Sequence, residues 1–269
     1  MKTTFRSLQP LYKQVFAFIF ILSAYNGHSD TFVSGLNALD RSHYASAYRS
    51  FKPLADKGVA EAQNNLGFLF QNGLGVRRNY NTAIKWYQSA ADQGLAEAEH
   101  NLGILNYRGH GVAQSYSIAR RWFNKAAKKG LRDSHYMLGL IFYKGEDVQV
   151  SLERASRHFT ISASSGDANS QYMLAHMILT GDAENPYNPQ QSRSSPFDFS
   201  MFIGESSDAL VAALSLASLA EKNGLKMATQ LVEFTSSQLN NDEIARSEGL
   251  VELCVSTDYE DCPIFSVPG

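Results

Sequence analysis

A spacing of 36 residues organises most of this sequence. Glycines, leucines and aromatic residues all recur at this interval. The glycines form two series, namely Gly58, Gly94, Gly130 and Gly166, and Gly73, Gly109, Gly145 and Gly181. A motif that recurs at a fixed period is a structural unit that buries its apolar face against copies of itself. The sequence therefore predicts a repeat array instead of a single globular core.

Each unit is predicted to contain two helices. In the first, residues 60–72, Ala62, Leu66 and Leu69 share one helical face. Gly67 on the same stretch has no side chain and leaves room for a neighbouring helix, whereas Gly73 is typical of a helix C-terminus. The second stretch carries its small and aromatic residues on one face; these are Ala83, Trp86, Tyr87 and Ala90.

The segment between the two helices could instead be taken for a phosphate loop, because Gly73 and Gly75 precede Arg77 and Arg78. A phosphate loop normally occurs once, follows a strand and continues into Lys-Ser or Lys-Thr. This segment recurs along the chain, lacks that Lys-Ser/Thr, and follows no Val- or Ile-rich run. We therefore expect the glycines to reverse the chain and the arginines to be solvated.

The predicted fold class is all-α, an α/α superhelical solenoid of helix pairs. Stacking of the pairs would give a continuous core with one concave side. Barrels and doubly wound α/β folds need strands, and no alternating strand pattern is visible.

The repeated pattern is Leu-Gly-x-x-aromatic-x-x-Gly-x-Gly-Val, then Ala-x-x-Trp-aromatic-x-x-Ala-Ala-x-x-Gly. It resembles the Sel1-like repeat, a relative of the tetratricopeptide repeat, over roughly residues 32–256. The third unit departs from it at Glu146 and Asp147, where Gly-x is lost. The resemblance implies a helical superhelix that binds proteins or peptides and usually has no catalytic machinery and no cofactor.

Several segments flank or interrupt the repeats. Lys2, Arg6 and Lys13 precede an apolar run over residues 15–24 and then small residues, the order of a secretory signal. Cleavage before Asp30, cleavage after Ala24 and an uncleaved anchor all fit. The predicted organisation is a signal peptide over 1–29, Sel1-like repeats over 30–182, a Pro/aromatic insertion over 183–206, the last repeat helix and a C-terminal helical pair over 207–256, and a tail over 257–269.

The two cysteines, Cys254 and Cys262, lie near the C-terminus. An even cysteine count in an exported chain predicts a disulfide, here one that ties the tail to the last helix. Asp242 is expected to cap that helix. A periplasmic or secreted location follows from the signal. The net charge of −2 shows no strong basic excess and so argues against a nucleic-acid partner.

The tetratricopeptide resemblance implies a concave binding face formed by the first helix of each unit. Carried over by position, its residues are mostly aromatic, amide or basic. The predicted binding residues are Asn64, His100, Tyr136, Tyr172, Gln71, Tyr107, Arg108, Tyr143 and Lys144. Aromatic and basic side chains often dominate interface energies, so we expect a protein or peptide partner, with a membrane contact only if the signal stays uncleaved. Tyr107 and Tyr143 could instead simply pack within the array.

An enzyme is the competing interpretation. Of the seven histidines, none forms a His-x-x-x-His metal motif, and no Gly-x-Ser-x-Gly nucleophile segment is present. His158 stands in the tryptophan column and is expected to be packed. We therefore predict no catalytic residue, metal or cofactor. The alternative is a periplasmic enzyme of hydrolase or β-lactam-binding type, because some Sel1-like proteins are credited with binding β-lactams.

Overall fold

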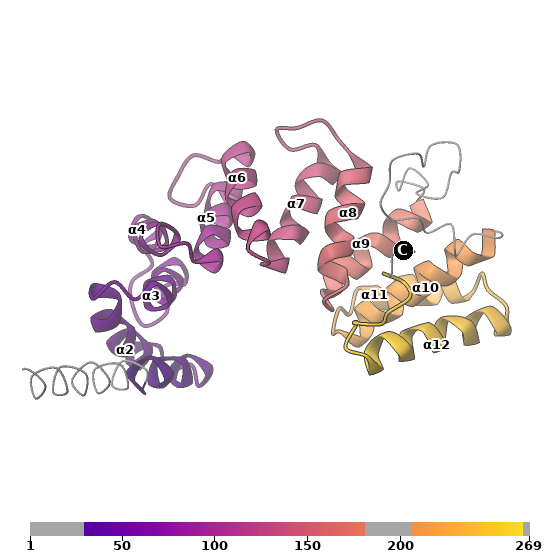
Figure 1. The fold of residues 1–269 in the computed structure, drawn as a ribbon, viewed down its shortest axis with the longest axis horizontal. Coiled ribbons are helices and arrows are strands. Elements are labelled where there is room, and N and C mark those ends of the chain that lie inside the picture. Colours follow the sequence, from indigo (N-terminus) through magenta and orange to yellow (C-terminus); the bar gives the residue numbers. More distant parts are fainter. Residues whose placement is uncertain (1–29, 181–205, 266–269) are drawn as a thin grey trace, which may run out of the picture. The chain divides into compact units, whose positions relative to one another are not determined.

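The computed structural model describes residues 30–180 and 206–265 (Figure 1). The predicted signal segment over 1–29, residues 181–205 and the last four residues lie outside this description, so only Ser206 of the predicted insertion over 183–206 is described. The chain divides into two compact units, one ending at Gln114 and the other beginning at Ser115.

The first unit consists of consecutive helices that pack on their neighbours. A helix over residues 30–40 comes first. It is followed by α2 (Tyr44–Asp56), α3 (Ala60–Asn72), α4 (Tyr80–Ala91) and α5 (Ala96–Arg108). Helix α3 lies between α2 and α4, and α4 also contacts α5. The buried side chains of α2 and α3 form one core, made of Ala47, Phe51, Leu54, Ala55, Ala62, Leu66 and Leu69.

The second unit continues the pattern and then ends it. Its helices are α6 (Tyr116–Lys128), α7 (Arg132–Lys144), α8 (Leu152–Ala163), α9 (Ala168–Thr180), α10 (Ser206–Lys222), α11 (Ala228–Ser236) and α12 (Asn241–Ser256). Helix α7 packs against α6 and α8, α9 against α8 and α10, and α10 against α11 and α12 (Figure 1). One apolar cluster runs from α7 to the segment after α12.

The described part of the chain is helical and contains no strand, which confirms the predicted all-α fold class. No helix within that part is both long and apolar enough to cross a membrane.

The helix ends follow the 36-residue period. Asn79, Ser115 and Ser151 are the N-caps of α4, α6 and α8, and each side chain accepts a hydrogen bond from the backbone N–H three residues later. Such a bond satisfies an N–H that has no partner within the helix. At the other end, Gly73 and Gly109 have φ = 70°, a left-handed conformation that costs glycine little.

Glycines also permit close helix packing inside each pair. A Cβ atom at Gly67 of α3 would lie 2.6 Å from ring carbons of Tyr87 on α4. A Cβ at Gly139 of α7 would lie 2.5 Å from the ring of Phe159 on α8. Carbon atoms in good contact are separated by roughly 3.5–4.0 Å. Each aromatic ring therefore occupies the space that a side chain would need.

The Gly-x-Gly pair is explained by packing and turning. A Cβ at Gly75 would lie 2.6 Å from the backbone nitrogen of Ala45, at the start of α2, and one at Gly111 would lie 2.6 Å from the Cβ of Tyr80, at the start of α4. Asp147 takes the equivalent position in the third repeat and still has a positive φ of 53°. Its Oδ2 atom accepts a hydrogen bond of 3.3 Å from the backbone N–H of Ser117. A carboxylate at the start of α6 thus replaces the backbone contact that glycine allows elsewhere.

The C-terminal helix is fixed at both ends. Its N-cap is Asn240 and not the predicted Asp242. The Asn240 side chain accepts from the N–H groups of Asp242 and Glu243, and Glu243 bonds back to the N–H of Asn240. The prediction was wrong because α12 begins at Asn241, which places Asp242 inside the first turn. At the other end, the structure contains the predicted disulfide between Cys254 and Cys262, and Ile264 beyond it is buried in the second unit's core.

Candidate binding surface and polar column

Two of the predicted binding residues in the first unit bond to neighbouring helices. The Tyr87 hydroxyl on α4 donates a hydrogen bond of 3.0 Å to the Gln71 side-chain oxygen on α3. Burial of this hydroxyl raises its pKa. The Asn101 side-chain nitrogen on α5 donates a bond of 2.9 Å to the Asn64 oxygen. Both acceptor oxygens therefore join helices of the array.

Helix α5 places Tyr107 and Arg108 at its C-terminal end, with His100 near its start. Tyr107 and His100 are half-buried, and Arg108 is exposed. The Tyr107 carbonyl accepts a hydrogen bond of 2.9 Å from the Gln114 side chain, so the loop after α5 is tied to the helix end.

In the second unit, α7 carries Tyr136, Tyr143 and Lys144. Both tyrosines are half-buried and pack against the apolar cluster. The ring centroids of Tyr136 and Phe159 are 6.0 Å apart, and burial, together with the negative charge of Asp167, raises the Tyr136 pKa. The Lys144 side chain is 51% exposed, and its nearest acid is Glu146, at 4.0 Å. The tyrosines therefore support the core with one side while remaining partly accessible.

Tyr172 lies on α9, where its ring centroid is 6.2 Å from that of His176. Both side chains are half-buried. Helix α8 packs against α7 on one side and α9 on the other. The second unit thus contains two helices, α7 and α9, that are each the first helix of a repeat and that carry half-buried aromatic residues one repeat apart.

A column of buried or half-buried polar residues was missed by the sequence analysis. It recurs every 36 residues at the third position before the repeat leucine: Gln63, Glu99, His135 and Gln171. The Gln63 amide donates 3.2 Å to the carbonyl of Ala55, and the Gln171 amide donates 3.1 Å to that of Ala163. His135 makes the corresponding backbone hydrogen bond to Ala127. Each bond joins the start of one repeat to the end of the preceding helix.

His135 also contacts the histidine that stands in the tryptophan column. Its Nδ1 atom lies 2.9 Å from the Nδ1 atom of His158 on α8. The His158 ring stacks on Phe142, with centroids 5.6 Å apart and ring planes 2° from parallel. Burial, and then the nearby charges of His135, Arg157 and Arg154, lower the His158 pKa to about 4. Burial also lowers the His135 pKa, opposed by the bond to Ala127. The expected packed role of His158 therefore includes a polar link between helices.

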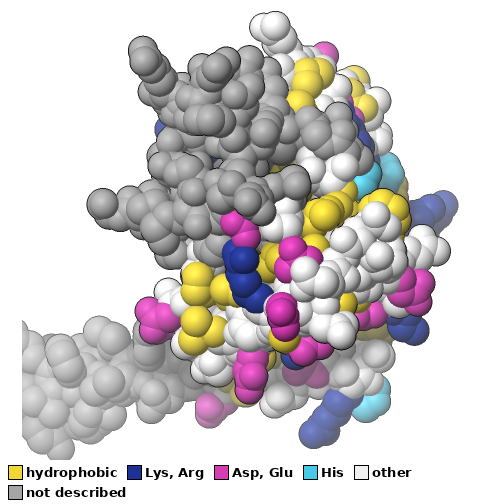
Figure 2. Space-filling model, turned by 90° about the vertical axis from the view of Figure 1, so that its right-hand side faces the viewer, with side chains coloured by type: hydrophobic (Ala, Val, Ile, Leu, Met, Phe, Trp, Pro, Cys, Tyr) yellow, Lys and Arg dark blue, Asp and Glu magenta, His cyan; other side chains and the backbone are white. Residues whose placement is uncertain are grey.

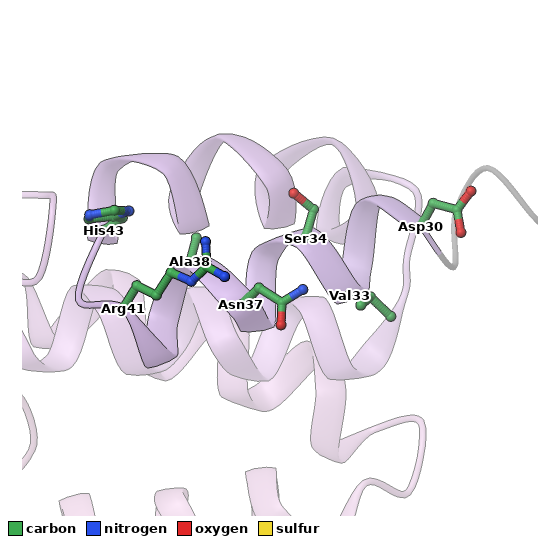
Figure 3. A pocket seen from close by; sticks show the side chains of 7 residues that line it. All are labelled: Asp30, Val33, Ser34, Asn37, Ala38, Arg41 and His43. Atoms are coloured by element: carbon green, nitrogen blue, oxygen red, sulfur yellow. The ribbon is translucent and has the colours of Figure 1, made fainter.

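A hydrolase would need a metal site or a nucleophile with its partner side chains. Across residues 30–180 and 206–265, no three His, Cys, Asp or Glu side chains are placed to hold a metal ion. A hollow is lined by Asp30, Val33, Ser34, Asn37, Ala38, Arg41 and His43. All seven come from the helix over 30–40 and the turn after it, and Figure 3 shows Asp30 and His43 at opposite ends. The serine, histidine and aspartate are therefore not assembled as a triad.

Comparison with known proteins agrees with the geometry of the repeats. The family model described as Sel1 repeat matches residues 60–95, 96–131, 132–167 and 168–193. None of the curated proteins matches the chain in sequence.

Two solved structures are similar in fold. The first is a Sel1 repeat protein from Oxalobacter formigenes, with 24% sequence identity and a TM-score of 0.65, covering 90% of this chain and 94% of that one. The second is c5321, a protective antigen of uropathogenic Escherichia coli strains with an SLR fold, at 24% identity and a TM-score of 0.63. That similarity covers 88% of this chain and 48% of c5321. With its recurring helix pairs, glycine-aromatic contacts and matched repeats, the chain belongs to the Sel1 repeat family.

Proposed function

We propose that this chain is an exported, non-catalytic adaptor that binds a protein or peptide segment along the exposed face formed by the first helix of each repeat. Sel1 repeat proteins are generally scaffolds for protein–protein interaction. The family match covers the repeats but assigns no role to individual side chains. Because fold alone does not decide function, the burial and charge around each side chain indicate which residues bind.

The burial pattern of α7 carries the proposal. Leu138 and Ile141 are fully buried, whereas Tyr136 and Tyr143 are half-buried and Lys144 is exposed. The helix therefore presents an aromatic edge with a cation at its end, beside the face that packs in the core. Tyrosine gives large contact area at low entropic cost, and a lysine beside it favours a carboxylate.

The partner that best fits this edge is an extended segment with an acidic side chain or a free C-terminal carboxylate. Lys144 has one acid nearby, at 4.0 Å and therefore at the limit of an ion pair. A ligand carboxylate could take this position without breaking a tight bond. On α5, Tyr107 and Arg108 form the same combination of an aromatic and a basic residue one repeat, or 36 residues, earlier in the sequence.

The experiment selects ligands from random peptides displayed on phage, using the purified chain as bait. The affinity of a selected peptide would then be measured for Tyr143→Ala, Lys144→Ala and Arg108→Ala. Loss of a charge that meets a carboxylate in a desolvated site costs about 2–5 kcal/mol, which is at least tenfold in affinity. A solvated surface charge contributes under about 1 kcal/mol.

Arg77→Ala and Arg78→Ala are matched controls, because both arginines are exposed in the loop after α3. They should leave the peptide affinity within about twofold. The proposal fails if the helix variants bind as well as the wild type, or if the loop variants lose more affinity.

Export is the second part of the proposal. It is supported by the order of charges and apolar residues in the first 29 residues, and by the pairing of both cysteines, because disulfides persist in oxidising compartments. Mass spectrometry of the protein from the producing cell would show its first residue. A chain retaining Met1 in the membrane fraction contradicts cleavage and favours the anchored form.

A further inference from the structure

The charges of this chain are separated along its sequence. Residues 100–132 contain seven Lys and Arg residues and no Asp or Glu. Residues 233–269 contain eight Asp and Glu residues and one Arg, a net charge of −7. The chain as a whole carries only −2. Two strongly charged regions of opposite sign are therefore hidden in a nearly neutral total.

The positive region places a row of cations on α6. Arg121, Lys125 and Lys128 are spaced by four and three residues, which puts them on one helical face. All three are exposed, and none forms an ion pair with another residue that the structure describes. The Lys125 ammonium lies 4.2 Å from the ring centroid of Trp122, which is half-buried beside it. We call Arg121, Lys125 and Lys128 the basic ridge.

The negative region has a matching face on α12. Glu248, Glu252 and Val255 have the same spacing of four and three residues, and all are exposed. The one arginine of this region, Arg246, is already neutralised by Asp208, at 2.6 Å. Leu253 and Val255 are 41% and 47% exposed beside Glu252. Figure 2 looks toward the C-terminal helices and shows acidic and hydrophobic side chains interspersed on that face. We call Glu248, Glu252 and Val255 the acidic face.

The two surfaces lie at opposite ends of the second unit. Helix α6 packs against α7, and α12 packs against α10, with α8 and α9 between them (Figure 1). The basic ridge and the acidic face of one molecule therefore belong to different ends of the stack. Their opposite charges can be paired through a second copy of the chain.

We infer that the chain associates head to tail, with the basic ridge of one copy docked on the acidic face of the next. Arg121 and Lys125 are four residues apart, about 6 Å along the helix axis, and so are Glu248 and Glu252. The two cations can therefore form ion pairs with the two carboxylates at the same time. Trp122 lies beside the ridge, and Leu253 and Val255 lie beside the carboxylates, so each surface also offers apolar area. This surface is distinct from the peptide face of α7 proposed above.

Such contacts join unlike surfaces, so each bound copy leaves one ridge and one acidic face open. Heterologous contacts of this kind form rings when the rotation closes and open chains when it does not. The attraction is between exposed charges and is screened over about 8 Å at physiological salt. Association is therefore strongest at low ionic strength.

Sedimentation velocity of the purified chain tests the inference over a range of concentrations, at about 0.02 M and about 0.5 M salt. At low salt the average mass should rise with concentration beyond that of the monomer, and at high salt it should return to the monomer. Arg121→Glu/Lys125→Glu and Glu248→Lys/Glu252→Lys should each remain monomeric at low salt. The chain that carries all four changes should associate again, because its charges are exchanged and not removed.

The control is Arg77→Glu/Lys85→Glu, which makes the same change in net charge at two exposed positions of the first unit. It should associate like the wild type. A wild-type chain that is monomeric at low salt overturns the inference. So does a control variant that loses association equally, or a fourfold variant that fails to regain it while its circular dichroism shows a folded protein.

Discussion

The Nδ1 atoms of His135 and His158 are 2.9 Å apart and join α7 to α8. A hydrogen bond between two imidazoles needs one N–H donor and one unprotonated acceptor. Adding a proton to the acceptor removes the bond and places a charge in a half-buried site. Both pKa values are therefore lowered by burial, that of His158 to about 4.

This pair makes the stability of the protein depend on pH. A lowered folded-state pKa means that the unfolded chain binds more protons between about pH 6.5 and about pH 4. The free energy of unfolding is therefore highest above this pH range and decreases as the pH falls through it. Each proton taken up on unfolding adds a slope of about 1.4 kcal/mol per pH unit. Urea unfolding at a series of pH values measures it.

The variant His135→Gln/His158→Phe should flatten that slope. Glutamine is the residue at the equivalent positions 63 and 171, and phenylalanine can keep the stacking on Phe142. His43→Gln, at an exposed position of the first unit, is the control and should keep the wild-type slope. A double variant with an unchanged slope would assign the pH dependence to other groups.

Gly139→Ala should destabilise the protein by about 1–3 kcal/mol, because the new Cβ would lie 2.5 Å from the Phe159 ring. Gly249→Ala is the opposite case. Gly249 lies inside α12, and a Cβ there would have no atom within 4 Å, so alanine should stabilise by up to about 1 kcal/mol. Thermal melts of both variants compare them, and equal effects of the same sign would contradict the packing role of Gly139.

Asp147 should respond in graded fashion to replacement. Asp147→Ala keeps the cost of a positive φ for a side-chain residue and loses the bond to the Ser117 N–H, for about 1–2 kcal/mol in total. Asp147→Gly loses the bond but relieves the backbone, so it should cost less. Chemical denaturation ranks the three proteins, and a glycine variant less stable than the alanine variant would refute this account.

Cys262→Ser should lower the free energy of unfolding by roughly 2.5 kcal/mol, the chain-entropy value for so short a loop. The change should also loosen the segment after α12, where Tyr259 accepts a hydrogen bond from Asn223 and Ile264 is buried. Hydrogen exchange should therefore accelerate over residues 257–265, while α3 and α4 keep their protection. Equal acceleration throughout the chain would argue against a local effect.

The repeat architecture was predictable because its signals are local. Gly73 ends a helix, Asn79 starts the next, and Gly67 leaves space for Tyr87, all within one 36-residue period. The N-cap of α12 was misplaced by two residues because aspartate and asparagine near position 240 are both good caps, and the choice depends on where the helix begins. A repeated motif fixes the type of element more firmly than its ends.

The candidate surface was less predictable because its bonds are tertiary. Gln71 was predicted on the binding face, and the structure adds that its side-chain oxygen accepts a hydrogen bond from Tyr87, sixteen residues away. The polar column was visible as a period, but its members are Gln, Glu, His and Gln. Because these residues differ chemically, the sequence indicated no common role for them. In the structure, Gln63, His135 and Gln171 each bond to the backbone carbonyl eight residues earlier.

Those carbonyl bonds have a consequence for how such a chain can evolve. Each spans only eight residues, from Gln63 back to Ala55 or from Gln171 back to Ala163, so none depends on how many repeats come before or after it. Duplication or loss of one 36-residue block in the gene leaves every remaining bond in place. Unequal recombination between repeats can therefore lengthen or shorten this protein in whole steps, without first inventing a new way to join its helices.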